Sequence, residues 1–342
     1  MSRRLVRIVA IGLLVLLALA AGGGYLVFGP NTPAYEDARG VKVYPGAAFE
    51  QVLDSLDASG VLAQRGTLAF LADATGWGRQ VKAGYYEFDA GASNYAILNT
   101  LRKGLQTAVR VTVPPGATIE RIAAVSGRRL AAGPEGMLAA LRSDSLADAL
   151  GVKPEALIGY LLPDTYKFFW LTPPATVVAR IKETYDDYLE EHGPPKDDLS
   201  PTDIASVASI VEWETARDAE RATVAGVYLN RLRRGMLLQA DPTVQYAILE
   251  LEGQKRRLFF ADYRLAHPYN TYLVRGLPPG PVTNPSRESI RAVLDPEDHE
   301  FLYFVAKGDG GHTFSKTLSE HNRAAQAFYA LMRERRAAQA AE

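Results

Sequence analysis

The chain has 342 residues, 47% of them apolar, which is enough for a sizeable core divided among two or three units. Its 38 basic and 39 acidic residues give a net charge of −1, without the basic excess of a duplex-binding protein, so we expect no nucleic-acid partner. The absence of cysteine excludes disulfides, thiolate nucleophiles and cysteine-ligated metals.

The first thirty residues carry a membrane-targeting pattern. Three arginines within the first seven residues precede an uncharged run over residues 8–28, which as a helix would span roughly 30 Å, the thickness of a bilayer core. The basic flank predicts residues 1–7 on the cytoplasmic side and the rest of the chain outside. A cleaved signal peptide is the alternative, because Ala18-Leu19-Ala20 resembles a cleavage site, but the apolar run continues past it and favours a retained anchor.

After a linker over residues 29–40, the sequence repeats a short pattern. The segment that starts Val43-Tyr44-Pro45-Gly46 returns 70 residues later as Val113-Pro114-Pro115-Gly116. Each copy predicts a short β-branched strand, a Pro-Gly turn and an amphipathic helix. Together with a strand-like segment at residues 85–88, the first copy predicts a βααβ module over residues 41–105.

Residues 106–195 form an intermediate region, mainly helical beyond residue 129 and interrupted by a Pro- and aromatic-rich segment at 160–166. A Gly-Pro-Pro break near residue 194 separates it from residues 196–342, whose last part, from about residue 318, predicts a polar helix.

A well-capped helix follows residue 200. Ser200 suits the N-cap, Pro201 the first turn and Asp203 the capping-box position. The apolar residues of its first turns share one face at helical spacing, namely Ile204, Val207, Ala208 and Val211.

Two glutamates stand near the end of this helix. At about 100° per residue, Glu212 and Glu214 lie about 80° to either side of the apolar face and point away from each other. A carboxyl at the border of an apolar face is a candidate for a raised pKa, and a protonated one could donate to a glycosidic oxygen. The alternative is that both pair with Arg217, Arg221 or Arg231 as surface salt bridges, and helix geometry alone does not choose between the two glutamates.

The region beyond this helix is dense in amides, hydroxyls and aromatic rings, the groups that bind sugars. Candidate substrate-binding residues are Glu214, Asn230, Gln239, Asp241, Thr243, Tyr246, Asn270, Tyr272, His312 and Thr313. His312 follows a Gly-Gly pair and either bonds in a cleft or closes a turn.

An ordered series of segments supports a family resemblance. The series is Gly159-Tyr160-Leu161-Leu162-Pro163-Asp164-Thr165-Tyr166, Ala208 to Thr215, Val227 to Leu232, Leu238-Gln239-Ala240-Asp241-Pro242-Thr243, Tyr269-Asn270-Thr271-Tyr272, Gly276-Leu277-Pro278-Pro279-Gly280 and Gly311-His312-Thr313-Phe314. Together they resemble the YceG-like, or MltG-type, endolytic murein transglycosylase family. Leu162 and Ala240 are mild departures from its usual pattern.

The resemblance implies an α+β fold in which residues 41–105 are a LysM-like module and residues 196–342 the catalytic region. It implies Glu212, the first Glu of the Val-Glu-Trp-Glu segment, as the catalytic acid/base, with Glu214 as the less favoured alternative. The implied reaction cleaves the β-1,4 bond between N-acetylmuramic acid and N-acetylglucosamine without water, leaving 1,6-anhydro ends on nascent strands. No cofactor or metal is implied.

The resemblance also implies a single-pass protein of the inner membrane with a periplasmic catalytic domain, in association with peptidoglycan synthases. Two other functions stay open. A metallohydrolase lacks its usual signature here, because His299-Glu300 is not followed by the second histidine of a zincin helix. A membrane-anchored glycan-binding scaffold without activity explains the anchor and the βααβ module, but not the polar-aromatic segments.

Overall fold

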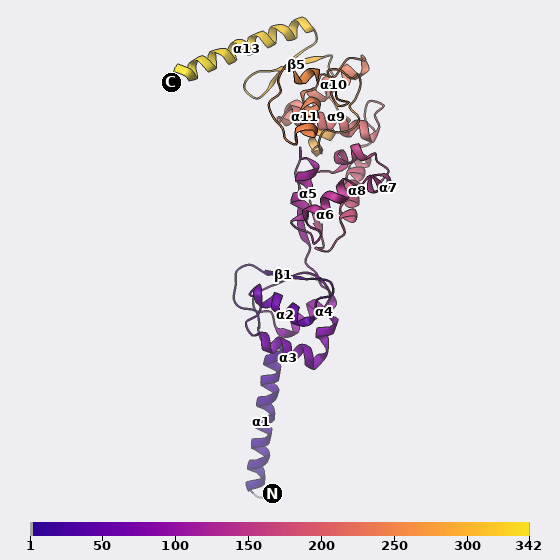
Figure 1. Ribbon diagram of the computed structural model, residues 1–342. Coiled ribbons are helices and arrows are strands. Elements are labelled where there is room, and N and C mark those ends of the chain that lie inside the picture. Colours follow the sequence, from indigo (N-terminus) through magenta and orange to yellow (C-terminus); the bar gives the residue numbers. More distant parts are fainter. Residues whose placement is uncertain (1–2, 342) are drawn as a thin grey trace. The chain divides into compact units, whose positions relative to one another are not determined.

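The computed structural model describes residues 3–341 and divides into two compact units (Figure 1). Unit 1 comprises Met1–Arg110 and Lys167–Thr172, and unit 2 comprises Val111–Tyr166 and Pro173–Glu342. The unit boundaries fall within the paired strands β3 (Val109–Val113) and β4 (Asp164–Phe168). Helices combine with small two-stranded sheets, which confirms the predicted mixture of α and β structure.

Unit 1 begins with the long apolar helix. Its elements in chain order are α1 (Arg3–Phe28), β1 (Arg39–Val43), α2 (Phe49–Ala58), α3 (Arg65–Thr75), the 3₁₀ helix η1 (Trp77–Gln80), β2 (Gly84–Phe88) and α4 (Asn94–Lys103). Helix α1 is long and apolar enough to cross a membrane, and none of its residues is buried within the protein. Its last turn contacts the rest of the unit, where Asn94 Nδ2 donates to the Leu26 carbonyl at 2.8 Å.

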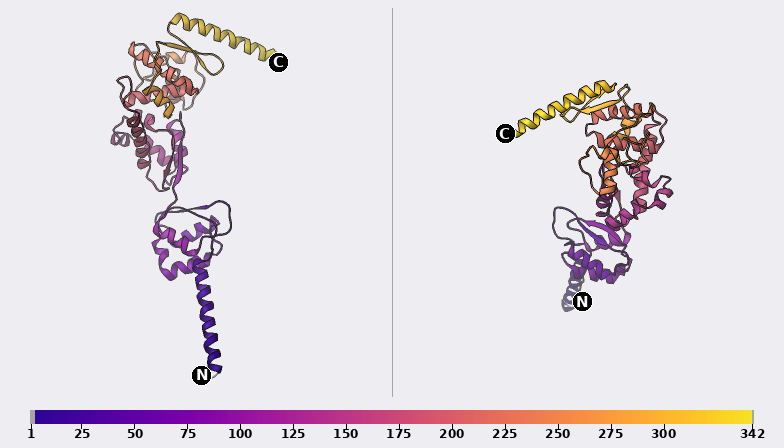
Figure 2. Two further views of the ribbon diagram at one scale, coloured as in Figure 1. Left: turned by 180° about the vertical axis from the view of Figure 1, so that it is seen from behind. Right: turned by 45° about the horizontal axis from the view of Figure 1, so that its top comes forward.

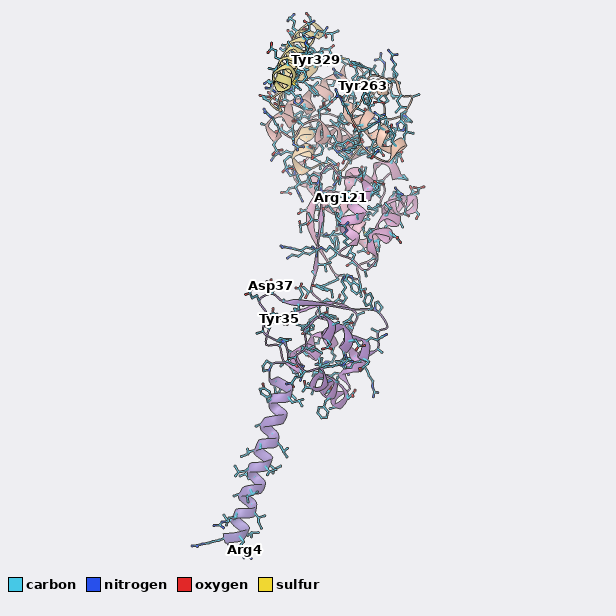
Figure 3. All side chains as sticks on the ribbon, turned by 60° about the vertical axis from the view of Figure 1, so that its left-hand side comes forward. Arg4, Tyr35, Asp37, Arg121, Tyr263 and Tyr329 are labelled. Carbon is cyan, nitrogen blue, oxygen red and sulfur yellow. The ribbon has the colours of Figure 1, made fainter. Side chains whose placement is uncertain are left out.

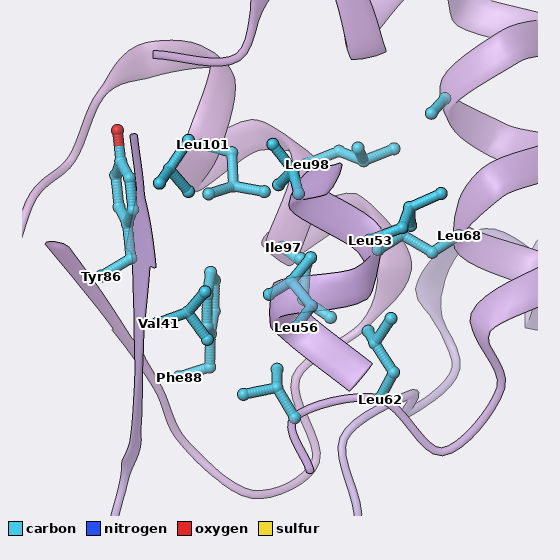
Figure 4. Packing of buried hydrophobic residues seen from close by; sticks show 14 of the residues in the cluster. Val41, Leu53, Leu56, Leu62, Leu68, Tyr86, Phe88, Ile97, Leu98 and Leu101 are labelled. Atoms are coloured by element: carbon cyan, nitrogen blue, oxygen red, sulfur yellow. The ribbon is translucent and has the colours of Figure 1, made fainter. Parts of the chain in front are cut away.

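The small core of unit 1 lies between a two-stranded sheet and three helices. Strands β1 and β2 are antiparallel, with Val41 opposite Tyr86. Alternate residues of both strands point inward against leucines and isoleucines of α2, α3 and α4, as Figure 4 shows. The β-α-α-β order matches the arrangement predicted for residues 41–105.

The predicted repeat is present in the structure. Strand β3 and helix α5 (Ile119–Gly127) start 70 residues after β1 and α2. The turn glycine of each copy, Gly46 and Gly116, has a positive φ, of 76° and 64°. Only glycine adopts such a turn without strain, which explains the shared Pro-Gly dipeptide.

Unit 2 holds most of the helices. After β3 and α5 come α6 (Gly133–Leu141), α7 (Asp144–Ala149), the 3₁₀ helix η2 (Pro154–Tyr160), β4, α8 (Pro174–His192), α9 (Pro201–Glu214), α10 (Asp218–Arg233), α11 (Asp241–Glu252), the 3₁₀ turn η3 (Asp262–Arg264), α12 (Arg287–Leu294), β5 (Tyr303–Ala306), β6 (His312–Ser315) and α13 (Leu318–Ala341). Strands β5 and β6 form an antiparallel hairpin that contacts the start of α13, whose remainder extends beyond the other helices of the unit (Figure 2).

Helix α9 is the central element of unit 2. It contacts α10, α11, α12 and η2, and every residue from Ile204 to Val211 is buried. The buried surface of α9 is therefore wider than the single apolar face expected from the sequence, because alanine and serine residues on the opposite side of the helix are buried as well. The serines are compatible with burial because they are satisfied locally: Ser206 Oγ donates to the Thr202 carbonyl and Ser209 Oγ to the Ser206 carbonyl, both at 2.8 Å. The capping box of Ser200 and Asp203 forms as predicted.

Candidate active site

Helix α9 ends at Glu214, because Thr215 adopts extended backbone angles of −136° and 136°. The last turn therefore presents three consecutive large side chains, Glu212, Trp213 and Glu214, in different directions. Trp213 fixes this turn from one side, since its indole Nε1 donates to the Gly116 carbonyl at 3.1 Å. The two carboxyls lie in different surroundings.

The carboxyl of Glu212 is enclosed by donors. Its Oε2 accepts from Arg221 Nη1 at 2.8 Å, from the Ser286 amide at 3.0 Å, from Ser286 Oγ at 2.5 Å and from Ser289 Oγ at 2.7 Å. The Glu212 and Arg221 side chains are only 8% and 10% exposed. This oxygen acts as an acceptor in a buried network that ties α9 to α10 and α12; Glu212 pairs with Arg221, but as a buried ion pair and not as the surface salt bridge of the alternative.

The carboxyl of Glu214 has the opposite surroundings. Its Oε2 is buried and has no hydrogen-bond partner among residues 3–341. Burial, helped by the nearby carboxylate of Asp241, raises the pKa of Glu214 to about 8, and the Tyr228 hydroxyl offsets part of that rise. Glu214 is therefore mostly protonated at neutral pH, with a proton to donate.

Two pockets meet at Glu214. The first, which we call the Tyr272 pocket, has a volume of about 490 Å³ and is rich in aromatic rings: Tyr228, Tyr263, Tyr272, Tyr303, Phe304 and Tyr329 line it. The second, the Trp213 pocket, has a volume of about 640 Å³ and lies beside the indole. Glu214, Asp241 and Tyr263 line both pockets, and Glu212 also lines the Trp213 pocket; we call the two pockets together the cleft. Figure 3 labels Tyr263 and Tyr329 on unit 2.

A second carboxyl faces the same cleft. Asp241 is the first residue of α11, and its Oδ1 accepts from the Tyr272 hydroxyl at 2.6 Å while its Oδ2 accepts from the Tyr263 hydroxyl at 3.3 Å. The centroids of the two phenol rings lie 4.5 Å apart, so the rings pack against each other. The cleft thus combines the Glu214 carboxyl, whose buried Oε2 has no donor among residues 3–341, with the Asp241 carboxyl, which two hydroxyls hold, while the Glu212 carboxyl also lines the Trp213 pocket.

Gln239, two residues before α11, has an unusual backbone conformation. Gln239 has a φ of 50°, and among residues 3–341 it is the one non-glycine residue with a positive φ. Its amide donates to the Thr271 carbonyl at 3.1 Å, and its side chain lines the Tyr272 pocket. Strained backbone of this kind is typical of functional sites.

The structure brings together part of the predicted substrate-binding set. Glu214, Gln239, Asp241, Tyr272 and His312 all line the Tyr272 pocket. His312 is hydrogen-bonded through Nδ1 to Glu220 at 2.7 Å, so it lines the pocket with this ring nitrogen already engaged.

Other members of that set have different surroundings. Thr243 and Asn270 are fully buried: the Thr243 hydroxyl donates to the Ala240 carbonyl at 2.7 Å, and the Asn270 amide donates to the carbonyls of Tyr263 and Leu265. Asn230 donates to the carbonyls of His299 and Phe301. These side chains hold the loops around the cleft.

The last two predicted residues also lie apart from Glu214. Thr313 pairs with Val305 in the β5–β6 hairpin. Tyr246 lines a separate pocket with Arg142 and Lys255.

Several cleft residues escaped prediction. Tyr263, His321 and Tyr329 line the Tyr272 pocket but belong to segments without a distinctive motif, whereas Tyr303 lies in one of the polar-aromatic segments but is not among the candidate residues. The serines that hold Glu212 lie more than 70 positions further along the chain. The sequence indicated only the polar, aromatic composition of residues 208–314, which includes both serines, Tyr263 and Tyr303.

The cleft combines aromatic rings with carboxyl groups. Residues 41–327 match the model of the YceG-like family, so the chain belongs to that family. It is 33% identical, over 74% of its own length and 75% of the relative's, to the endolytic murein transglycosylase of Bacillus subtilis (strain 168). Both the family and its mixed fold were predicted from the sequence.

Two further comparisons agree. The chain is 28% identical to the endolytic murein transglycosylase of Streptococcus pneumoniae serotype 2 (strain D39 / NCTC 7466), covering 93% of this chain but only 64% of that longer protein. The crystal structure of a yceG-like protein from Listeria monocytogenes aligns with a TM-score of 0.53 at 27% identity, over 84% of this chain and 99% of the other.

Proposed function

We propose that this chain is an endolytic peptidoglycan lytic transglycosylase, with Glu214 as its catalytic acid/base. The carrying observation is the Glu214 carboxyl, which lines both pockets of the aromatic cleft, has one buried oxygen without a partner among residues 3–341, and has a pKa raised by burial. The names of the Bacillus and Streptococcus relatives support the reaction. The substrate is the β-1,4 bond between N-acetylmuramic acid and N-acetylglucosamine.

The reaction needs one group that gives a proton and later takes one back. Glu214 donates its proton to the glycosidic oxygen while the bond from that oxygen to C1 of the muramyl residue breaks. The resulting carboxylate then removes the proton of the muramyl C6 hydroxyl, whose oxygen attacks C1 and closes the 1,6-anhydro ring. The net change moves one proton from O6 to the leaving oxygen and consumes no water.

Asp241 stabilises the positive charge that develops at C1. Its carboxylate faces the same two pockets as Glu214, and the hydroxyls of Tyr272 and Tyr263 hold its orientation. A fixed charge that requires no reorganisation during the reaction is an effective way to stabilise such a transition state.

The sequence resemblance placed the acid at Glu212, and the contacts of the two carboxyls lead us to propose Glu214 in its place. Four donors already occupy one oxygen of Glu212. We assign Glu212 the role of a positioning residue, which holds Arg221 and the start of α12 so that the last turn of α9 keeps its direction.

The remaining parts of the protein fit the same proposal. Helix α1 anchors the chain in the inner membrane with both units in the periplasm, as its length and apolarity support. Residues 41–105 act as a LysM-like glycan-binding module, residues 106–195 connect it, and residues 196–342 are the catalytic region. Action on nascent strands, beside peptidoglycan synthases, would make the enzyme a terminator of chain elongation.

The proposal is tested by incubating the full-length protein in detergent with purified sacculi and searching the products for 1,6-anhydro ends by mass spectrometry. Wild type and the control Glu135→Gln, an exposed glutamate on α6, should produce such ends, and Glu214→Gln should produce none. Binding of sacculi without new ends by wild type would support the anchored scaffold and reject the enzyme. Full activity of Glu214→Gln would reject its assignment as the acid.

A further inference from the structure

A third pocket adjoins the cleft. This Arg142 pocket has a volume of about 710 Å³ and lies within unit 2, between the start of α5, η2 and the end of α11. Lys255 lines both this pocket and the Trp213 pocket, so the two spaces meet at its side chain. A chain that branches from a glycan in the cleft can therefore enter the Arg142 pocket beside Lys255.

The walls of the Arg142 pocket combine apolar surface with charges of both signs. Ile119, Ile158 and Leu249 supply apolar area. Two cations, Arg142 and Lys255, and two carboxylates, Glu120 and Glu250, also line it. Such a lining suits a short peptide with carboxylates and a free amine better than it suits an uncharged sugar.

Lys255 is the cation best placed to receive a carboxylate. Its ammonium lies over the ring of Trp213, 3.0 Å from the ring centroid, and it forms no ion pair among residues 3–341. Partial burial lowers the pKa of the Lys255 ammonium to about 8, so a bound carboxylate would stabilise its charged form.

The charged groups of the opposite wall can also exchange partners. Arg142 bonds to Glu120 at 2.7 Å, but the two side chains are 59% and 56% exposed, so a ligand carboxylate can compete for the guanidinium. Glu250 accepts from the Tyr246 hydroxyl at 3.1 Å and lies 3.2 Å from His267. Its half-exposed carboxylate is available to an amine.

We propose that the Arg142 pocket binds the stem peptide of the muramyl residue in the cleft. The inference rests on the proposed function, because it assigns a subsite to the same substrate. The stem leaves the sugar through the lactyl group on O3, its carboxylates meet Lys255 and Arg142, and the amine of its diamino acid meets Glu250. No bond is made or broken in the Arg142 pocket. Its role is to select muramyl residues that carry a stem peptide.

Binding tests the inference independently of activity. Ligand-observed NMR with the full-length protein in detergent compares N-acetylmuramic acid with N-acetylmuramyl-tripeptide containing diaminopimelate. We expect the muramyl-tripeptide to bind at least roughly tenfold tighter, the effect of one charged hydrogen bond. Lys255→Met, which removes the charge, and Leu249→Trp, which fills the pocket, should abolish the difference, whereas the exposed control Lys153→Met should keep it.

Equal affinity of wild type for the two ligands, or an undiminished difference in both pocket variants, would overturn the inference. A second comparison uses stem-bearing glycan strands and strands stripped of stems by an amidase. The ratio of their kcat/KM values should favour stem-bearing strands in wild type and fall toward one in Lys255→Met. If the proposed function fails but the inference holds, neither kind of strand gives anhydro ends, while wild type still binds the muramyl-tripeptide more tightly.

Discussion

Glu214→Gln should remove activity. The variant should also be more stable than wild type, by a margin that grows as the pH rises. The pKa of Glu214 is about 8 in the fold, against an ordinary value of 4.5. The fold therefore favours the neutral acid, and this contribution to stability is fully present below about pH 4.5 and lost as the pH approaches about 8. At about 1.4 kcal/mol for each pKa unit, wild type should lose about 3 kcal/mol relative to the variant between pH 5 and pH 8.

Glu212→Gln should instead be less stable than wild type. Arg221 is 8% exposed and would lose its buried counterion, while its other partner, Asp218, has a side chain that is 73% exposed. Removing one partner of a buried ion pair leaves an uncompensated charge, so we expect a loss of about 3 kcal/mol. Any loss of activity in this variant should follow its loss of structure.

Urea unfolding of the full-length wild type and both variants in detergent, from pH 5 to pH 8.5, measures these effects. Tryptophan fluorescence follows the transition, since Trp213 lies between the two glutamates. If the free-energy difference between wild type and Glu214→Gln did not change with pH, Glu214 would not be a neutral acid in the fold. If Glu212→Gln kept its stability but lost all anhydro products, the catalytic role would return to Glu212.

Further outcomes follow from the same contacts. The kcat/KM for strand cleavage should fall about tenfold for each pH unit above about 8, as Glu214 loses its proton; a rate that keeps rising there would contradict its role as acid. Tyr272→Phe leaves Asp241 with one donor at 3.3 Å, so kcat should fall about tenfold with little change in KM, as steady-state kinetics would measure. Thr243→Val removes a buried hydroxyl bonded to the Ala240 carbonyl and should cost about 1 to 3 kcal/mol in urea unfolding. Ser200→Ala removes the N-cap of α9 and should lower the free energy of unfolding by about 1 kcal/mol, a loss that an unchanged urea midpoint would exclude.

Much of the fold could be predicted because its signals are local. The capping box of α9 lies within four residues, and the repeated strand–turn–helix pattern within about twenty. The width of the buried face of α9 could not be predicted in this way, because Ala205 lies beside Gly159 of η2 and Ser209 accepts from the Val282 amide, and both neighbours are distant in the sequence.

The choice between two glutamates shows where local information ends. Periodicity puts both carboxyls at equal angles from the apolar face, so their different roles depend on which distant residues arrive at each side. Ser286 and Ser289 bring donors to one of them, and Asp241 brings a second negative charge to the other. Donors stabilise a carboxylate, while burial beside a negative charge stabilises the neutral acid, and only the latter can begin the cleavage of a glycosidic bond.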